Sequence, residues 1–243
     1  MNTGFRITRI KSTLRGDIRI QHRNGFYYAT LFVVALWVLI FSRLPALDLR
    51  GIWPVLLLTN LIITTFYFMG GLILLEKGEG TLAAQVVTPL RIGEYMASKV
   101  LTLSILAIIE NVVLTVLIIG ANIRFLYLVT GILLAGAMYT LLGFLIVARY
   151  DSINEYLLPS MFYVMLFSLP IAPYFGIEAP FLQWLLYFHP LQAPLILLEA
   201  AFQHVYFWQI LYAISYSALA LTFIYGLTRQ AFHRFVVIGE GVR

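Results

Sequence analysis

Long apolar stretches alternate with short polar segments along the whole chain. Six of the stretches are close to or above the length of about 20 mostly apolar residues that a membrane-spanning helix needs. They cover residues 26–44, 53–75, 100–120, 125–148, 156–174 and 206–227. The pattern therefore predicts an all-α membrane protein with six transmembrane helices.

A seventh apolar stretch, residues 181–201, differs from the other six. It contains Pro190 and Pro194, and proline removes a backbone donor and interrupts a helix. We expect this stretch to form two short helices in a re-entrant or extracellular hairpin between spans five and six, where non-spanning backbone is tolerated if protein surrounds it.

The first 25 residues are basic and amphipathic. Ile7, Ile10, Leu14 and Ile18 recur at spacings of three and four, which places them on one stripe of a helix, and most of the arginines lie off that stripe. This pattern predicts an N-terminal helix lying in the plane of the inner membrane leaflet. A disordered basic tail is the alternative.

The basic residues also predict the orientation of the spans. With six spans, all but three of the 16 lysines and arginines fall on one side of the membrane; the exceptions are Arg43, Arg50 and Arg124. Cytoplasmic loops carry an excess of lysine and arginine, so both termini are expected in the cytoplasm. We expect a single domain in the plasma or inner membrane, with a cytoplasmic helix at residues 1–25, spans within 26–227 and a cytoplasmic tail at 228–243.

The composition indicates that lipid is the main solvent of this chain. Of its 243 residues, 61% are hydrophobic and 11% are charged, whereas soluble domains carry roughly 25% charged residues. The net charge of +5 lies mostly beside the spans, so it indicates topology and not nucleic-acid binding. The chain has no cysteine and its four histidines are scattered, so no metal site is expected.

A charged segment interrupts the apolar pattern between spans two and three. The run EKGEGTL at residues 76–82 is followed by VTPL at residues 87–90. Thr81 can cap a helix that starts at Leu82, and Leu82, Val86 and Leu90 then share one face of that helix. The segment is either a generic cytoplasmic loop or a short helix that a partner protein grips from the water side.

The same segment resembles the signature of ABC-2-type transporter permeases. That signature is a Glu-basic-x-x-Gly-Thr-Leu run, followed by Thr-Pro-Leu and by a lysine that opens the next span. The matching residues here are Glu76, Lys77, Gly80, Thr81, Leu82, Thr88, Pro89, Leu90 and Lys99. The family often has an acidic residue directly after the basic one, where this chain has Gly78 and carries Glu79 one position later.

A second resemblance to the same family lies near the C-terminus. The runs LQW at residues 182–184 and HPL at residues 189–191 are similar to the family's extracellular hairpin before its last span, where Asn-Pro-Leu is more usual. Gln183, Trp184, His189 and Pro190 are therefore the candidate hairpin residues.

The resemblance implies a permease that pairs with a second copy or a sister permease and works with a separate ABC ATPase. This chain has no Gly-x-x-x-x-Gly-Lys-Ser/Thr loop to cradle phosphates, so ATP and Mg would bind to the partner, and this chain would bind no cofactor and have no catalytic residues. Residues 82–90 would form a coupling helix seated in the ATPase. The candidate coupling residues include the signature residues Lys77, Gly80, Thr81, Thr88, Pro89 and Leu90. Glu76, Glu79 and Arg91 would supply its polar contacts, and Leu82 and Val86 its anchors.

Glu110 is the only acidic residue in the middle of a predicted span, and Asn111 follows it. A charged side chain at that depth costs roughly 2.5–3.5 kcal/mol on insertion scales, and such residues generally face the interior of the helix bundle. Two interpretations stay open. Glu110 either contacts a cationic or zwitterionic substrate or acts as a proton-sensitive gate, or it is a protonated group that bonds to a neighbouring span and steadies the packing or the dimer interface.

These features lead to two hypotheses on function. The first is the permease subunit of an ABC exporter for a lipophilic or amphipathic compound, such as a drug or antibiotic, a lipid-like molecule or a peptide. Within the family, the short chain is similar to drug exporters, including permeases for fluoroquinolone export. The alternative is a non-transporting membrane sensor or immunity protein that uses the charged segment to dock a cytoplasmic partner.

Overall fold

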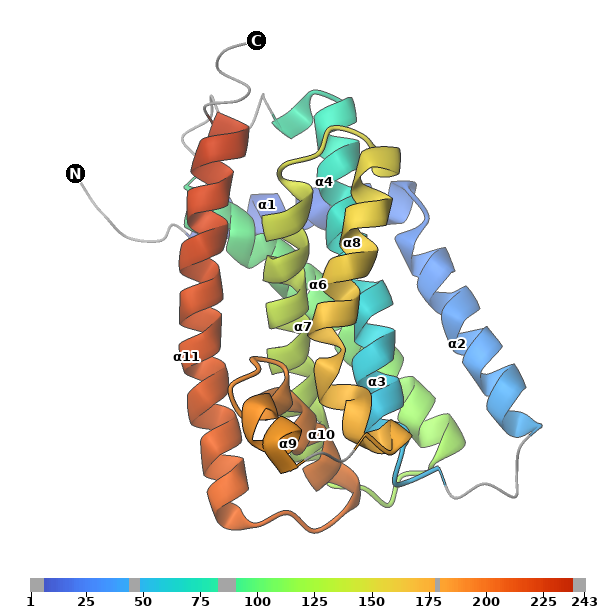
Figure 1. The fold of residues 1–243 in the computed structure, drawn as a ribbon. Coiled ribbons are helices and arrows are strands. Elements are labelled where there is room, and N and C mark those ends of the chain that lie inside the picture. Colours follow the sequence, from blue (N-terminus) through green and yellow to red (C-terminus); the bar gives the residue numbers. More distant parts are fainter. Residues whose placement is uncertain (1–6, 44–48, 83–90, 178–179, 238–243) are drawn as a thin grey trace.

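The computed structural model describes residues 7–43, 49–82, 91–177 and 180–237, and every secondary-structure element within them is helical (Figure 1). The elements in chain order are α1 (Ile7–Arg23), α2 (Phe26–Ser42), α3 (Trp53–Leu61), the π-helix η1 (Ile62–Tyr67), α4 (Phe68–Gly78), α6 (Ile92–Ile118), α7 (Phe125–Val147), α8 (Ile153–Phe167), the 3₁₀-helix η2 (Leu169–Phe175), α9 (Pro180–Leu186), α10 (Gln192–Phe202), α11 (Phe207–Ala231) and the π-helix η3 (Phe232–Val237).

Four helical segments are long and apolar enough to cross a membrane. They are Trp53–Gly78, Ile92–Ile118, Phe125–Val147 and Phe207–Phe235. Two further pairs meet the same criterion only when both helices are taken together, and each pair is bent: Ile10–Arg23 with Phe26–Ser42 by 60°, and Ile153–Phe167 with Leu169–Phe175 by 61°. The described residues thus contain four candidate spans, or up to six if each bent pair is counted as one span.

Helix α7 forms the centre of the bundle. It packs against α6, α10, α11, η1 and α4, and it is the most buried of the four candidate spans, whereas α11 is the least buried. Two glycines of α7 let neighbouring helices approach it closely. A Cβ at Gly131 would lie 2.9 Å from Cδ2 of Leu198 in α10, and one at Gly143 would lie 2.6 Å from the carbonyl oxygen of Phe66 in η1.

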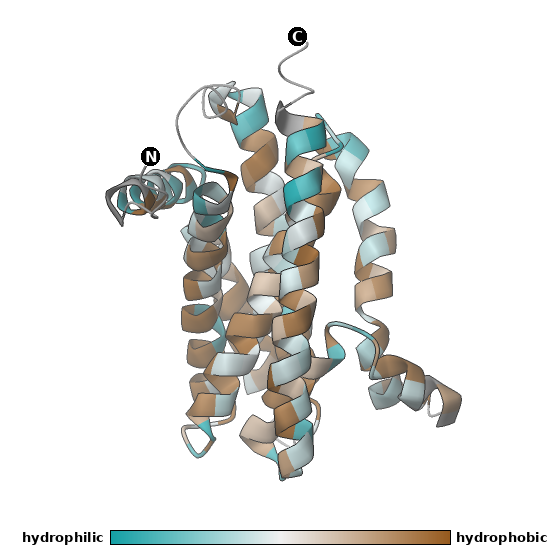
Figure 2. Ribbon diagram, turned by 90° about the vertical axis from the view of Figure 1, so that its left-hand side faces the viewer, coloured by the Kyte–Doolittle hydropathy of each residue, from teal (hydrophilic) through white to brown (hydrophobic). Residues whose placement is uncertain are grey.

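Apolar side chains also cover the outer faces of the bundle. On α6, exposed residues recur every four positions along one stripe, and the mainly hydrophobic middle of the upright helices is visible in Figure 2. The members of the stripe are Leu101, Ile105, Ile109, Val113 and Leu117. Large exposed apolar side chains along a whole helix fit a hydrocarbon environment and not water.

The start of the third span differs from the sequence prediction. We expected Lys99 to open a span at residue 100, but α6 begins at Ile92 and contains Lys99 seven residues further on. The hydropathy pattern could not show this, because the charge of Lys99 is compensated by acidic side chains from other helices. The second span also has a feature that periodicity did not predict, namely the π-helical turn at Ile62–Tyr67 in its middle.

The fifth predicted span is not one straight helix. It bends where α8 gives way to η2, a 3₁₀ segment that contains Pro170 and Pro173. Proline has no backbone N–H, so these two residues cannot donate the hydrogen bonds that would continue an α-helix. The expected break at residues 181–201 is confirmed, since α9 and α10 are two short helices, and α10 is buried against α7 and α11.

The predicted N-terminal helix is present as α1, which lies across the upright helices (Figures 1 and 2). Gly25, with φ of +78°, makes the turn into α2, a backbone conformation that glycine adopts at little cost. The coupling helix expected at residues 82–90 lies outside the described residues except for Leu82.

The close approach of α7 to η1 leads to a stability prediction. Gly143→Ala should lower the free energy of unfolding by about 1–3 kcal/mol, because its Cβ meets a backbone carbonyl that cannot rotate away. Gly226→Ala in α11 is the control, since nothing lies within 4 Å of a Cβ there. Thermal unfolding of the purified protein in detergent measures both, and equal midpoints for the two variants would contradict the close packing.

Candidate functional site

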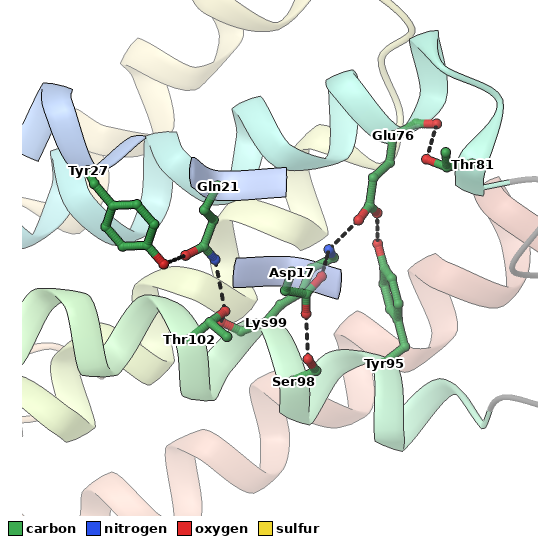
Figure 3. Close-up of polar contacts among 9 residues, drawn as sticks. All are labelled: Asp17, Gln21, Tyr27, Glu76, Thr81, Tyr95, Ser98, Lys99 and Thr102. Carbon is green, nitrogen blue, oxygen red and sulfur yellow. Dashed lines mark hydrogen bonds and ion pairs between the residues drawn. The ribbon is translucent and has the colours of Figure 1, made fainter. Parts of the chain in front are cut away.

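The charged residues at the end of α4 reach three different parts of the same chain. Glu76 points into the bundle, toward α6 and α1 (Figure 3). Lys77 reaches the turn between α7 and α8, and Glu79 pairs with Arg23 at the end of α1. We call Glu76, Lys77 and Glu79 with these partners the α4 junction.

Lys99 is the centre of the buried part of this junction. Its Nζ donates to Oδ1 of Asp17 at 2.9 Å and to Oε1 of Glu76 at 2.5 Å, so it joins α1, α4 and α6 (Figure 3). The three side chains are at most 3% exposed. The ammonium also lies 4.7 Å from the centre of the Tyr95 ring, an arrangement that favours a cation.

Each carboxylate has a further donor on its free oxygen. The Tyr95 hydroxyl donates to Oε2 of Glu76 at 2.5 Å, and the Ser98 hydroxyl donates to Oδ2 of Asp17 at 2.5 Å (Figure 3). Burying an ion costs several kcal/mol unless close opposite charges and additional hydrogen bonds offset it. Both conditions are met here, which explains how a lysine is accommodated inside an otherwise apolar helix.

The same contacts fix the rotation of α1. Gln21, one turn after Asp17, donates to Oγ1 of Thr102 at 2.9 Å and accepts a hydrogen bond from Tyr27 (Figure 3). The inward face of α1 is therefore polar at these two positions, whereas Ile18 of the predicted apolar stripe is 49% exposed. The stripe correctly indicated a helix, but Ile18 on that stripe does not face the bundle.

Lys77 connects the end of α4 to the turn after α7. Its Nζ donates to the carbonyl oxygens of Ala148 at 3.0 Å and Tyr150 at 2.7 Å, and lies 3.2 Å from Oδ1 of Asp151. A cation at the C-terminal end of a helix satisfies carbonyls that have no partner within that helix. Lys77, the basic residue of the sequence signature, thus bonds the end of α4 to the turn after α7.

The structure changes the interpretation of several predicted coupling residues. The carboxylate of Glu76, which we expected to face a partner, is buried and already paired with Lys99, so it is not available to a partner protein in this conformation. Thr81 donates from its hydroxyl to the carbonyl oxygen of Glu76 and so closes the end of α4. Gly80 turns the chain with φ of +67°, and Leu82 is fully buried.

The remaining coupling residues are only partly described. Glu79 and Arg91 are exposed, and the Arg91 backbone N–H donates to Glu94 at the start of α6. Val86, Thr88, Pro89 and Leu90 lie outside the described residues. Gly78 is exposed, and nothing lies within 4 Å of a Cβ added there.

Glu110 and Asn111 belong to a second polar group in the middle of the bundle. Nδ2 of Asn60 in α3 donates to Oε1 of Glu110 at 3.0 Å and lies 3.2 Å from Oδ1 of Asn111, and Thr64 in η1 donates to Oε2 of Glu110. Trp37 of α2 donates to Asn60. Glu110 is 2% exposed, so this geometry supports the interpretation that it bonds neighbouring helices together.

His189 and Pro190 lie in the turn between α9 and α10, and Trp184 on α9 is 75% exposed. Nδ1 of His189 accepts a hydrogen bond from the backbone N–H of Leu191 at 3.2 Å. Burial lowers the pKa of His189 to about 4, against the opposing effect of a hydrogen bond with the Leu166 backbone. The imidazole is therefore neutral at pH 7, as an acceptor at Nδ1 requires. The backbone of Gln183 is part of α9, but its side chain is outside the described atoms.

Sequence reasoning missed most members of the α4 junction and of the polar group around Glu110. Asp17 carried a signal, since it is the only acidic residue among the first 25. No signal in the sequence marks the other members, because nothing in a single sequence shows which distant polar residues meet. These members are Tyr95, Ser98, Asn60 and Trp37.

These features define the class of protein. A helical chain with several long apolar helices and fully paired ions in its interior is a multi-pass membrane protein.

Comparison with known proteins identifies the family. The model of the fluoroquinolones export permease protein family matches residues 8–240. Two curated relatives, from the CDC 1551 / Oshkosh and H37Rv strains of Mycobacterium tuberculosis, are named fluoroquinolones export permease proteins. Each is 31% identical over 243 residues, which cover 97% of this chain and 100% of the relative. The chain therefore belongs to the fluoroquinolones export permease protein family.

The ion cluster gives the first prediction on the site. Lys99→Met should lower the free energy of unfolding by about 3–5 kcal/mol, because two buried carboxylates lose their cation. Lys11→Met, at an exposed position of α1, should stay within about 0.5 kcal/mol of wild type. Thermal unfolding in lipid-free detergent measures both.

A double variant supplies a further control for this cluster. Glu76→Gln/Lys99→Met should recover part of the stability that Lys99→Met loses, because only Asp17 is then left as an unpaired charge. If Lys99→Met is as stable as Lys11→Met, the buried pairs do not hold the junction together.

The hairpin turn gives a second prediction. An asparagine at residue 189 can accept the same N–H two residues further along the chain, so His189→Asn should stay within about 0.5 kcal/mol of wild type. His189→Ala loses the acceptor and should cost about 1 kcal/mol. Thermal unfolding at pH 7 compares the two, and equal midpoints for Asn and Ala would contradict a role for this bond.

Proposed function

We propose that this chain is the transmembrane subunit of an ATP-driven exporter of the ABC-2 type, with six spans and both termini in the cytoplasm of the plasma or inner membrane. A separate ABC ATPase would bind ATP and Mg, and a second permease copy would complete the pore. The exported compound is a fluoroquinolone or a similar lipophilic or amphipathic drug. The names of the two relatives support the substrate class, and the sequence signature at residues 76–90 supports the ATPase partner.

The observation that carries this proposal is the α4 junction. Any force on residues 82–90 reaches α4, whose end is bonded through Lys99 to α6 and α1 and through Lys77 to the α7–α8 turn. Closure of the paired ATPases would therefore move several helices together. A generic loop would not need the charged residues at its base to be tied to three other segments.

An apolar groove offers a binding place for the compound. It lies between α6, α7 and α11, has a volume of about 450 Å³ and is open to one side. Its lining includes Ala97, Val100, Leu141, Leu221 and Tyr225. Drug-sized ligands generally occupy apolar sites of about 300–1,000 Å³ with few polar groups, so a lipophilic compound fits this groove in size and chemistry.

The Glu110 group takes part in this function as a structural element. Its carboxylate accepts hydrogen bonds from α3 and η1, so it links the second and third spans halfway along their length. A movement of the α4 end would thus reach α3, η1 and α6, which the Glu110 group already joins to one another.

Lys77 allows a direct test of force transmission. The chain is co-expressed with its candidate ATPase, and ATPase co-purification, ATP hydrolysis and fluoroquinolone efflux from everted vesicles are measured. Lys77→Met should keep the ATPase bound but lower efflux per ATP at least about 10-fold, a loss equivalent to about 1.4 kcal/mol of coupling. Lys77→Arg should retain most of the efflux, since a guanidinium can reach the same carbonyls.

The possible outcomes separate the alternatives. If no ATPase co-purifies and efflux persists without ATP, the ABC assignment is wrong. If the ATPase binds but no compound is exported by wild type, the chain acts as a docking protein for a partner. If Lys77→Met exports as well as wild type, the junction does not transmit the movement.

A further inference from the structure

The rotation of α1 about its own axis determines which residues it presents outward. Asp17 and Gln21 are buried and bonded to Ser98, Lys99 and Thr102 of α6. These contacts lie on one face of α1, so the opposite face points away from the bundle.

Cations occupy that opposite face. Arg15 and Arg19 are each two residues from Asp17, and at 100° per residue both lie about 160° around the helix from it. Lys11 and Arg23 extend the row at the same spacing of four residues, and all four side chains are exposed. Among the ion pairs of the described residues, only Arg23 of this row has an acidic partner, Glu79.

This row of like charges calls for an anionic partner. Cations four residues apart on a helix repel one another, and α1 offers nothing acidic on the same face. A surface that carries several negative charges would remove this repulsion, so charge complementarity indicates the kind of partner.

The position of α1 indicates that the negative charges belong to a membrane. It packs on α6 at Ser98–Thr102, inside the candidate span Ile92–Ile118 and not beyond its end. Beside the cations, Ile18 is 49% exposed, and Tyr28 at the start of α2 is 67% exposed. Exposed apolar and aromatic side chains next to cations are typical of the headgroup level of a bilayer.

We propose that the outward face of α1, formed by Lys11, Arg15, Arg19 and Arg23, is a binding surface for the headgroups of anionic phospholipids. Because Asp17 on the inward face holds Lys99, bound lipid also stabilises the seating of α1 against the ion cluster. A ligand that binds only the folded state raises its stability, so anionic lipid should stabilise the whole junction.

The test uses the purified full-length protein in a neutral detergent. Its thermal unfolding midpoint is followed while phosphatidylglycerol, phosphatidylcholine or soluble glycerol phosphate is added. We expect stabilisation by phosphatidylglycerol alone, and we expect it to weaken at about 0.5 M salt, where charges are screened within a few ångströms.

Two charge-matched variants locate the surface. Arg15→Gln/Arg19→Gln should raise the half-saturating concentration of phosphatidylglycerol roughly 10- to 30-fold, given the attraction of each cation to an anionic surface. Arg229→Gln/Arg234→Gln removes two exposed cations from α11 and η3 at the same end of the bundle. This control should change the half-saturating concentration less than about two-fold.

Three outcomes would overturn the proposal. Equal losses in the two variants would mean that general electrostatic attraction acts instead of a surface on α1. Equal stabilisation by glycerol phosphate would assign the site to a free phosphate. Equal stabilisation by phosphatidylcholine would show that the negative charge of the lipid is not required. If the α1 variant does not purify as a folded protein, the lipid and salt comparisons on wild type decide, and native mass spectrometry of retained lipid provides the second measurement.

Discussion

The ammonium of Lys99, held between the carboxylates of Asp17 and Glu76, is the contact on which the rest of the α4 junction depends. Helix α6 begins at Ile92, before the apolar run that starts at residue 100, and therefore contains Lys99. This buried charge is tolerated because the two carboxylates neutralise it. The contact also determines where α1 lies and which of its faces points outward. Three helices that are far apart in the chain are therefore held at one point.

The polar contacts occur at two levels of the bundle. At the end of α4, Lys77 and Lys99 connect α4 to α1, α6 and the α7–α8 turn. Halfway along the spans, Asn60 joins α2, α3 and α6 through Trp37 and Glu110. Helices α7 and η1 also approach each other closely at Gly143. Helices α2, α8 and α11 expose much of their apolar surface.

Much of the architecture followed from the sequence because hydropathy acts locally. A run of about 20 apolar residues has to be helical in a membrane, and Pro190 lies in the turn that separates α9 from α10. The π-helix in the second span and the bend of the fifth did not follow from periodicity in the same way. The first has no composition of its own, and the second comes from Pro170 and Pro173, which do not interrupt the hydropathy pattern.

The sequence by itself determined the helical class, the candidate spans, the hairpin and the place of the charged segment, since each depends on the order of residues along a short stretch. Only the tertiary structure decided that Glu76 faces inward, that Lys77 bonds to the α7–α8 turn and that the cations of α1 face outward. The physical reason is that the cost of burying a charge depends on its partners. Asp17 and Lys99 are 82 positions apart, and only folding brings them together.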